Sequence, residues 1–562
     1  MRLFDEHVKR KTILLDGVWD FAADEGNVGI SEEWFKKFPE DTIKVTVPGC
    51  INNRLGYINF QNICWYKKEF YAQGSICIRF NSVSEYARVY LDGEYLGDHY
   101  GGFTAFEFEA KVEVGMHSLV VMVDPRCTED TIPLLEVDWH HYCGIMRNVE
   151  LFEFETTAIK YMRVDYEISE DMNAAKYNIR AKIKSLAESA IKTNCRIDID
   201  GDIVCDEVIE IDGEKEICIS GELNDIRLWD IYKPELYTVT IKTDDDDLID
   251  KIGFRKIEVD GKRILLNKKP VKFLGVNRHE EHPDWGFAMP PSLNMKDIDI
   301  IKDLNANTIR GAHYPNTKLF VDLCDANGIM FWSEIPMWGF NKETLSRSLI
   351  IERGLTMHTE MVEQYYNHPS IVIWGLHNEI ASDTQEGYDI TEKFSKRVRE
   401  LDPSRLITFA SALPHKDICF EFCDFISINQ YIGWYWAELS GWDNFFEAVK
   451  EALKEKGLDN KPIVMSEFGV AALFGNKNFE GLKWSENYQV EYFDYTINKF
   501  LNDEDMSGVY LWQYCDTRTY PKMDINRARC YNNKGILNEY RQPKLAYYSV
   551  KEIFKKESQL TK

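Results

Sequence analysis

The 562-residue chain lacks the sequence signatures of several protein classes. It contains no H-E-x-x-H helix, EF-hand loop, P-loop or dinucleotide-binding glycine fingerprint, so we expect neither a metal nor a cofactor. Its first residues form no apolar signal segment, and no later hydrophobic run is long enough to cross a bilayer. Its thirteen cysteines form no paired C-x-x-C framework, which indicates reduced, mostly buried thiols. We therefore predict a cytoplasmic protein that binds no membrane.

Positive charge is also scarce, because 67 Lys and Arg stand against 93 Asp and Glu and leave a formal net charge of −26. Such a charge opposes binding to the phosphate backbone of nucleic acids, so we expect no nucleic-acid partner. An acidic small molecule would also be repelled unless its pocket supplied a local cation. The 14 Trp and 29 Tyr exceed the needs of a plain core. Such a surplus often lines sugar sites, although β-rich folds also use aromatic residues.

The first part of the chain predicts two β-sandwiches. Up to residue 155, short alternating runs separated by turns are typical of an antiparallel jelly roll, with a hairpin turn at Asp92-Gly93. From 156 to 259 the alternation continues at a spacing that suits a smaller immunoglobulin-like sandwich. We interpret the four aspartates at 244–247 as a solvated turn. Strands are expected at 75–80, 87–91, 117–123, 177–183, 195–199, 216–220 and 237–243.

Residues 260–562 follow a different pattern, in which short apolar runs alternate with amphipathic segments of helical length. Eight such alternations predict a (β/α)8 TIM barrel, whose chemistry lies at the C-terminal ends of its strands. The fold class is therefore multidomain, β plus α/β. The eight strands are expected at 271–276, 308–310, 330–333, 371–376, 406–410, 425–429, 463–466 and 509–513, with helices such as 295–304, 317–326 and 390–401 between them.

Two glutamates follow the fourth and seventh of these apolar strands, Glu379 and Glu467. These strands lie across the barrel mouth from each other, so the two carboxyl groups can flank one sugar. One can protonate the leaving oxygen while the other attacks the anomeric carbon or activates water. We assign the acid/base role to Glu379, because Asn378 beside it can bond a sugar hydroxyl, and the nucleophile role to Glu467. Either glutamate alone could form a rim salt bridge, but the placement of both favours catalysis.

The segments around these residues carry a family resemblance. Gly275-Val-Asn-Arg-His-Glu280, Trp374-Gly-Leu-His-Asn-Glu379 and Ser466-Glu467-Phe-Gly469 resemble the signatures of glycoside hydrolase family 2. The resemblance covers nearly the whole chain and implies the same order of jelly roll, immunoglobulin-like domain and barrel. It also implies a retaining mechanism through a covalent glycosyl-enzyme, with carboxyl groups about 5–5.5 Å apart. One departure is Phe468, where relatives often have Tyr.

A second resemblance concerns the substrate. Tyr531-Asn-Asn-Lys-Gly-Ile536 resembles the Asn-x-Lys segment of the β-glucuronidases in that family. The resemblance implies that Asn532 and Lys534 hold the C6 carboxylate of the sugar. Taken alone, the segment is an ordinary turn. In a chain of net charge −26, however, it would supply the cation that an acidic sugar needs.

Further residues are expected around the sugar. For some of them a structural role stays open: core packing for Trp512, a loop salt bridge for Asp138, and bracing of strand ends for both histidines. By resemblance, Tyr431 bonds the nucleophile, Tyr435 bonds the substrate carboxylate, Asp138 reaches the sugar hydroxyls from the jelly roll, and Trp512 contacts the sugar. Asn429 begins the tyrosine-rich loop, and His279 and His313 line the pocket floor.

We therefore predict a retaining, exo-acting β-D-glucuronidase whose partner is a glucuronide or a uronate-ended oligosaccharide. A β-galacturonidase, or an enzyme that takes both sugars, is the alternative, because the two uronates differ only at C4. A β-galactosidase is disfavoured by Lys534, and a non-catalytic carbohydrate-binding protein by the intact glutamates. The segment between Trp338 and His368 is shorter than in some gut bacterial members of the family that the chain resembles. We therefore expect a more open barrel mouth, unless a neighbouring subunit covers it. We expect a homo-oligomer, either a dimer or a tetramer.

Overall fold

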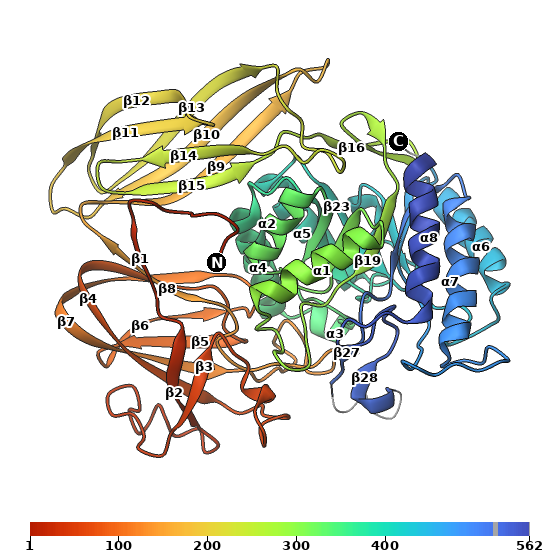
Figure 1. The fold of residues 1–562 in the computed structure, drawn as a ribbon, viewed down its shortest axis with the longest axis horizontal. Coiled ribbons are helices and arrows are strands. Elements are labelled where there is room, and N and C mark those ends of the chain that lie inside the picture. The colour runs from red at the N-terminus through yellow and green to blue at the C-terminus, as the bar shows by residue number, and fades with distance from the viewer. Residues whose placement is uncertain (521–526, 561–562) are drawn as a thin grey trace.

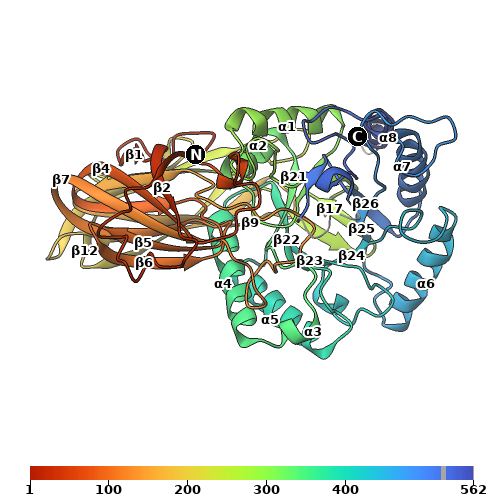
Figure 2. The same ribbon diagram turned by 90° about the horizontal axis from the view of Figure 1, so that it is seen from below.

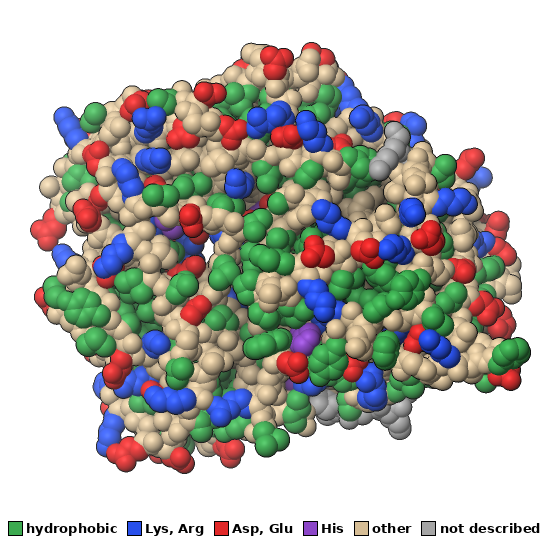
Figure 3. Space-filling view, viewed as in Figure 1, with side chains coloured by type: hydrophobic (Ala, Val, Ile, Leu, Met, Phe, Trp, Pro, Cys, Tyr) green, Lys and Arg blue, Asp and Glu red, His purple; other side chains and the backbone are tan. Residues whose placement is uncertain are grey.

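Two β-sandwiches lie beside a closed barrel in the computed structural model, which describes residues 1–520 and 527–560 (Figure 1). The jelly roll and the immunoglobulin-like sandwich occupy the left of the view, and the barrel with its helices occupies the right. This confirms the predicted fold class and the order of the three parts. On the face that Figure 3 shows, acidic and basic side chains are interspersed.

The jelly roll is an eight-stranded antiparallel sheet in the order β1-β8-β4-β7-β5-β6, with β2 pairing β3 and β4. Alternate side chains of its long central strands pack into one core. Asp92 and Gly93 join β5 to β6 with φ of +52° and +84°, which confirms the predicted hairpin. The strands are β1 (Lys11–Leu14), β2 (Gly17–Ala23), β3 (Ile43–Val47), β4 (Cys64–Phe80), β5 (Tyr86–Leu91), β6 (Glu94–Tyr100), β7 (Phe106–Asp124) and β8 (Val149–Phe154).

The immunoglobulin-like sandwich packs a three-stranded sheet, β13-β10-β9, against a four-stranded sheet, β12-β11-β14-β15. Isoleucine and valine side chains from both sheets fill the space between them. The four strands expected in this part are all present. The strands are β9 (Thr157–Ile168), β10 (Ala174–Ser185), β11 (Ile191–Ile199), β12 (Asp202–Ile211), β13 (Glu214–Asn224), β14 (Tyr237–Lys242) and β15 (Asp247–Ile252).

A small sheet of β16 (Ile257–Asp260), β17 (Arg263–Leu266) and β18 (Lys269–Pro270) leads into the barrel. All eight predicted barrel strands are present and close in sequence order. The eighth ends earlier than expected, because the N–H of Gln513 donates to the carbonyl of Lys534 instead of a strand. The strands are β19 (Phe273–Asn277), β20 (Thr308–Gly311), β21 (Met330–Glu334), β22 (Ile371–Asn378), β23 (Leu406–Ser411), β24 (Ile426–Asn429), β25 (Ile463–Phe468) and β26 (Met506–Leu511).

Helices surround the barrel and cover the outer face of its strands (Figure 2). The inner faces pack against one another inside the barrel, so the strand residues are buried on both sides. This explains why the barrel strands are continuous apolar runs and not alternating ones. None of the helices in the described ranges is long and apolar enough to cross a membrane. The helices are α1 (Pro291–Asp303), α2 (Lys318–Asn327), α3 (Lys342–Leu345), α4 (Ser348–Tyr365), α5 (Gln385–Leu401), α6 (Gly441–Glu455), α7 (Glu486–Leu501) and α8 (Leu545–Leu560).

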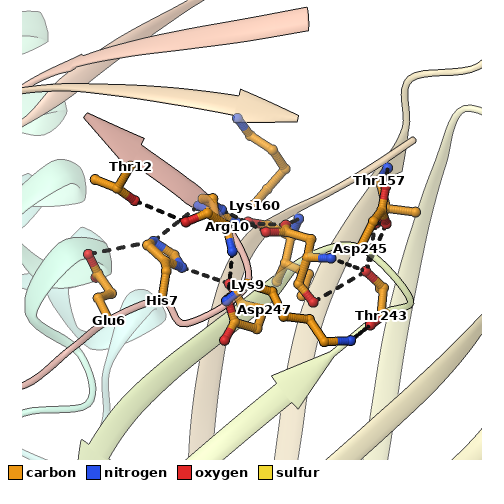
Figure 4. Close-up of polar contacts among 12 residues, drawn as sticks. Glu6, His7, Lys9, Arg10, Thr12, Thr157, Lys160, Thr243, Asp245 and Asp247 are labelled. Atoms are coloured by element: carbon orange, nitrogen blue, oxygen red, sulfur yellow. Dashed lines mark hydrogen bonds and ion pairs between the residues drawn. The ribbon is translucent and has the colours of Figure 1, made fainter. Parts of the chain in front are cut away.

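The acidic run at 244–247 is not a solvated turn, so that interpretation was wrong. Asp246 and Asp247 are fully buried. Figure 4 shows Asp247 beside Lys9 and Arg10 of the N-terminal segment. The Arg10 guanidinium donates to both Asp246 oxygens at 2.8 Å, and the Asp247 carboxylate accepts from the backbone N–H groups of residues 8–10. The acidic run therefore joins the N-terminus to the immunoglobulin-like sandwich, and only Asp244 in it is exposed.

Removal of the Asp246 carboxylate should destabilise the fold. The Asp246→Ala variant leaves Arg10 buried without its partner, and loss of one member of a buried pair costs roughly 3–5 kcal/mol. We expect a lower urea midpoint for the first unfolding transition. Asp244→Ala, in the same run but exposed, is the matched control and should cost within about 1 kcal/mol. Equal losses in the two variants would contradict the assigned role.

Candidate active site

Glu379 and Glu467 both lie at the C-terminal rim of the barrel. Glu467 is the fifth residue of β25 and is buried, whereas Glu379 follows the last residue of β22 and is partly exposed at the mouth. The negative charge of Glu467 is the second-largest influence on the pKa of Glu379, after burial. The two carboxyl groups therefore lie close enough to interact electrostatically.

Arg310, the third residue of β20, connects the groups beneath the mouth. Its guanidinium donates to both oxygens of Glu334 at 2.9 and 2.8 Å, to Glu467 Oε1 at 2.8 Å and to Asn378 Oδ1 at 2.7 Å. Tyr431 donates its hydroxyl to the other oxygen of Glu467 at 2.6 Å. Burial raises the pKa of Glu467, and Arg310 and Tyr431 oppose that rise by stabilising the carboxylate. The result is an oriented carboxylate that is suited to nucleophilic attack.

Arg310 was missed in the sequence analysis. The sequence did contain a signal for it, a single arginine within an apolar strand run. A charged side chain inside a buried barrel strand requires a partner of opposite charge or a polar one. The partner Glu334 ends the next strand, β21, and was visible only as one polar strand end among several.

Asn429, the last residue of β24, holds the other glutamate. Its amide nitrogen donates to Glu379 Oε1 at 2.8 Å and to Asn378 Oδ1 at 3.1 Å, and its oxygen accepts from the Ser466 hydroxyl at 2.7 Å. Burial and the Glu467 charge raise the pKa of Glu379 to about 8, against the opposing bond from Asn429. A pKa of about 8 favours the protonated form of Glu379 at neutral pH, and no residue in the described ranges donates a hydrogen bond to its Oε2.

Asn378 retains one unused donor. Its side-chain oxygen accepts from both Arg310 and Asn429, whereas its Nδ2 is buried without a hydrogen-bond partner among the described residues. A buried amide without a partner costs free energy unless a ligand or water satisfies it. Nδ2 is thus a buried donor that a ligand could satisfy, and its bond to a sugar hydroxyl stays a prediction.

A cationic pocket lies beside the glutamates. Lys534 is buried and donates to the Tyr435 hydroxyl at 2.9 Å, and its ammonium lies 5.3 and 4.9 Å from the ring centres of Tyr431 and Tyr435. Burial lowers the pKa of Lys534. Burial alone would raise the pKa of Tyr435, but the charges of Lys534 and Arg527 outweigh it and lower that pKa. The pocket is therefore strongly electropositive.

Arg527 is a second cation at this pocket that the sequence analysis missed. It forms a two-point ion pair with Asp138 at 3.0 and 2.6 Å and donates to the Tyr435 hydroxyl at 3.2 Å. Asn532, in the short strand β28 (Tyr531–Asn532) that pairs β27 (Thr517–Arg518), donates to Asp138 at 2.8 Å. Asp138 thus forms a salt bridge, the alternative role that the sequence analysis considered for it, and the bridge lies at the pocket itself. The two cations carry one positive charge more than the carboxylate of Asp138 neutralises, and this excess charge can attract an anionic ligand.

Aromatic rings form the remaining wall. Trp512 stacks on His313 with ring centres 5.2 Å apart and meets His279 edge-on at 5.6 Å, and Trp139 of the jelly roll lies 5.5 Å from His313. Burial holds the pKa of both histidines well below its usual range, so they are neutral. His313 braces Glu334 at 2.7 Å. His279 has a buried Nε2 without a partner in the described ranges and can serve a ligand.

One cluster in the described part of the chain could geometrically hold a metal: Asp322, Asp325 and His368. Its ligand atoms already have partners, since Arg2 donates to Asp322 at 2.9 Å and His368 Nδ1 lies 2.6 Å from Asp325. The cluster adjoins the start of β22, at the opposite end of the barrel from Glu379. Its contacts fit a structural role that joins the N-terminal segment to the barrel.

The chain matches three family models in the order of its domains. Residues 56–155 match "Glycosyl hydrolases family 2, sugar binding domain", residues 157–255 match "Glycosyl hydrolases family 2", and residues 257–558 match "Glycosyl hydrolases family 2, TIM barrel domain". The last match alone spans more than half of the chain.

Individual relatives span nearly the full length. A β-glucuronidase of Streptococcus agalactiae is 27% identical over 95% of this chain and 94% of its own. Among solved structures, a β-galacturonidase of Eisenbergiella tayi bound to galacturonate is 33% identical, with a TM-score of 0.92 and 99% of both chains covered. A Ruminococcus gnavus β-glucuronidase in complex with a C6-substituted uronic isofagomine is 26% identical, with a TM-score of 0.88 and the same coverage.

The titration of Glu379 should limit activity at high pH. A general acid works only when protonated, so kcat/KM for a glycoside with a poor leaving group should fall as pH rises through about 8. The acid limb should reflect Glu467, which must be ionised to attack. A pH profile of kcat/KM, checked against enzyme stability over the same range, measures both limbs. A value that stays level well above pH 8 would contradict the assignment of Glu379.

Proposed function

Because this chain belongs to glycosyl hydrolases family 2, we propose that it is a retaining, exo-acting β-D-glucuronidase. The observation that carries the proposal is the joint presence of two geometries in one pocket. Burial and the charge of Glu467 raise the pKa of Glu379 to about 8, Arg310 donates to the Glu467 carboxylate, and the buried Lys534 lies in the same pocket with Arg527. The first geometry suits acid-assisted glycoside cleavage, and the second suits a sugar that carries a carboxylate.

In the first step Glu467 attacks the anomeric carbon while Glu379 transfers its proton to the departing glycosidic oxygen. The bonds from Arg310 and Tyr431 stabilise the carboxylate form of Glu467 and orient it for this attack. The products are the free aglycone and a sugar esterified to Glu467. Esterification removes the negative charge of Glu467, and with it one of the causes that raise the pKa of Glu379.

In the second step Glu379, now ionised, takes a proton from water as the water attacks the anomeric carbon. The ester bond to Glu467 breaks, the sugar leaves with its original configuration, and Glu379 is protonated again. The same electrostatic coupling thus makes Glu379 an acid in the first step and a better base in the second.

The positive charge of the pocket indicates an acidic sugar as the substrate. We infer that the C6 carboxylate binds between Lys534, Arg527 and the Tyr435 hydroxyl, where two cations face the single carboxylate of Asp138. A sugar without that carboxylate would leave these buried cations without compensation. A uronate therefore fits the pocket better than a neutral sugar, which supports a β-glucuronide over a β-galactoside.

A β-galacturonidase is the second candidate. It is favoured by the likeness to the Eisenbergiella tayi β-galacturonidase at 33% identity, above the 26–27% of the β-glucuronidases cited here. The two sugars share the C6 carboxylate and differ only in the C4 hydroxyl, so both would use Lys534. An assay of aryl β-glucuronide against aryl β-galacturonide separates the two functions.

We also propose that the enzyme acts in the cytoplasm as a homo-oligomer, either a dimer or a tetramer. Eleven of the thirteen cysteines are buried as free thiols, as expected for a protein kept in a reducing compartment. The segment between Trp338 and His368 consists mainly of α3 and α4, and we infer that a neighbouring subunit covers the mouth beside it. Light scattering on the purified protein measures the oligomeric state.

Substitution of either glutamate should separate the two catalytic roles. Glu467→Ala removes the nucleophile and should lower kcat on any uronide by a factor on the order of 10³ or more. Glu379→Gln keeps the shape but not the proton, and should cost roughly 10²–10⁴-fold on an alkyl glucuronide. The loss should be smaller on an aryl glucuronide with an acidic leaving group. Equal losses on both leaving groups would argue against Glu379 as the acid.

Lys534 should determine the preference for uronides. Lys534→Ala removes a charged hydrogen bond worth about 1.5–3 kcal/mol, so kcat/KM on aryl uronides should fall roughly ten- to a hundredfold or more, with much less effect on aryl galactoside or mannoside. Lys477→Ala, an exposed lysine on the loop between β25 and α7, is the control for general charge effects. A Lys534→Ala enzyme that kept its uronide preference would refute the substrate assignment while leaving the chemistry intact.

A further inference from the structure

The loop that carries Lys534 has little regular structure of its own. β28 ends at Asn532, and the following residues form a buried turn at the barrel rim. A lysine on such a turn can meet a carboxylate reproducibly only if the backbone on both sides of it is held. The contacts beneath the turn show how this is achieved.

A buried ion pair, Asp516–Lys544, holds both sides of Lys534. The Lys544 ammonium donates to Asp516 Oδ1 at 2.7 Å and to the carbonyls of Asn533 at 3.0 Å and Ala472 at 2.7 Å. Asp516 Oδ1 also accepts from the N–H of Gly535 at 3.0 Å. The peptide groups directly before and after Lys534 are therefore bound by opposite ends of one ion pair.

Both side chains of this pair are fully buried, with no exposed surface. Burial of two charges costs free energy that their attraction only partly repays, so such a pair is weak evidence for stability and better explained by conformational specificity. Gly535 supports this view. A Cβ on it would lie 2.3 Å from Asp516 N and 2.4 Å from Cys515 C, so the loop approaches the strand end as closely as a glycine permits.

We propose that Asp516 and Lys544 are positioning residues that set the place of Lys534 in the pocket and thereby determine affinity for uronides without touching the sugar. The proposal rests on the proposed function. Lys544 immediately precedes α8, Asp516 follows β26 and Ala472 lies in the loop after β25, so the pair joins three elements to the loop of Lys534. The ammonium of Lys534 donates to Tyr435, and within the described residues it forms no hydrogen bond or ion pair with either member of the pair.

The kinetic signature follows from this geometry. The uronate carboxylate takes no part in bond breaking and contacts Lys534 in both the ground state and the transition state. Displacement of Lys534 therefore weakens binding throughout, which raises KM and leaves kcat nearly unchanged. Loss of a merely structural contact would instead lower thermal stability without a selective effect on uronide binding.

The test uses Lys544→Met, which keeps an unbranched chain up to the position of Cε but removes the ammonium, and Asp516→Asn, which keeps the shape and removes the charge. On an aryl β-glucuronide we expect KM, and the inhibition constant of free glucuronate, to rise at least about tenfold, with kcat within about threefold of wild type. If Lys544→Met fails to fold, Asp516→Asn decides the question.

Two further measurements separate positioning from stability. In a Lys534→Ala background, Lys544→Met should add little to KM, because the group that it positions is gone. Arg405→Met is the matched control: Arg405 forms an equally buried pair with Asp402 at 2.6 Å, but at the start of β23, the opposite end of the barrel. It should lower Tm and leave KM unchanged.

The outcomes are distinct. An unchanged KM in both Lys544→Met and Asp516→Asn, or additive effects of Lys544→Met and Lys534→Ala, would overturn the positioning role. A wild-type enzyme that hydrolyses no uronide would overturn the proposed function instead. A rise in KM for Arg405→Met equal to that of Lys544→Met, at an equal loss of Tm, would attribute the effect to stability and also overturn the positioning role.

Discussion

The Arg310 guanidinium is the constraint around which the rim of the barrel is organised. It is fully buried, cannot lose its charge under ordinary conditions and must therefore be surrounded by acceptors. Glu334, Glu467 and Asn378 supply them from three different strands. Because each acceptor is fixed by this one cation, the ends of β21, β22 and β25 have a fixed relation to one another. The geometry of Glu467 is thus a consequence of satisfying a buried charge.

The same constraint separates the properties of the two glutamates. Glu467 is bound by a cation and by the Tyr431 hydroxyl, so its carboxylate form is stabilised. Among the described residues, Glu379 accepts a side-chain hydrogen bond only from the neutral amide of Asn429. It is also close to the charge of Glu467, so burial and that charge raise its pKa to about 8. Two identical side chains on opposite strands therefore have different hydrogen-bond partners: a cation and a hydroxyl donate to Glu467, whereas a neutral amide donates to Glu379. This difference is the physical basis of the acid and nucleophile roles proposed for them.

The barrel and the rim carboxylates could be predicted because they depend on local patterns. Buried parallel strands are continuous apolar runs, and a polar residue directly after such a run lies at the rim by topology alone. Asp246 and Arg527 could not be placed in this way. Each forms its ion pair with a residue hundreds of positions away, Asp246 with Arg10 and Arg527 with Asp138, so nothing in the adjacent sequence indicates the partner. The positions of those charges follow from how the domains pack.

The measurement that tests the account most directly is covalent trapping of the nucleophile. A 2-deoxy-2-fluoro β-glucuronyl fluoride should react with the enzyme, because its fluoride leaves readily while the 2-fluoro group slows hydrolysis of the ester that forms. Mass spectrometry of the digested protein should then locate one glucuronyl adduct on Glu467, and Lys534→Ala should slow its formation. Inactivation without a covalent adduct, or an adduct on a residue other than Glu467, would contradict the proposed retaining mechanism and its nucleophile.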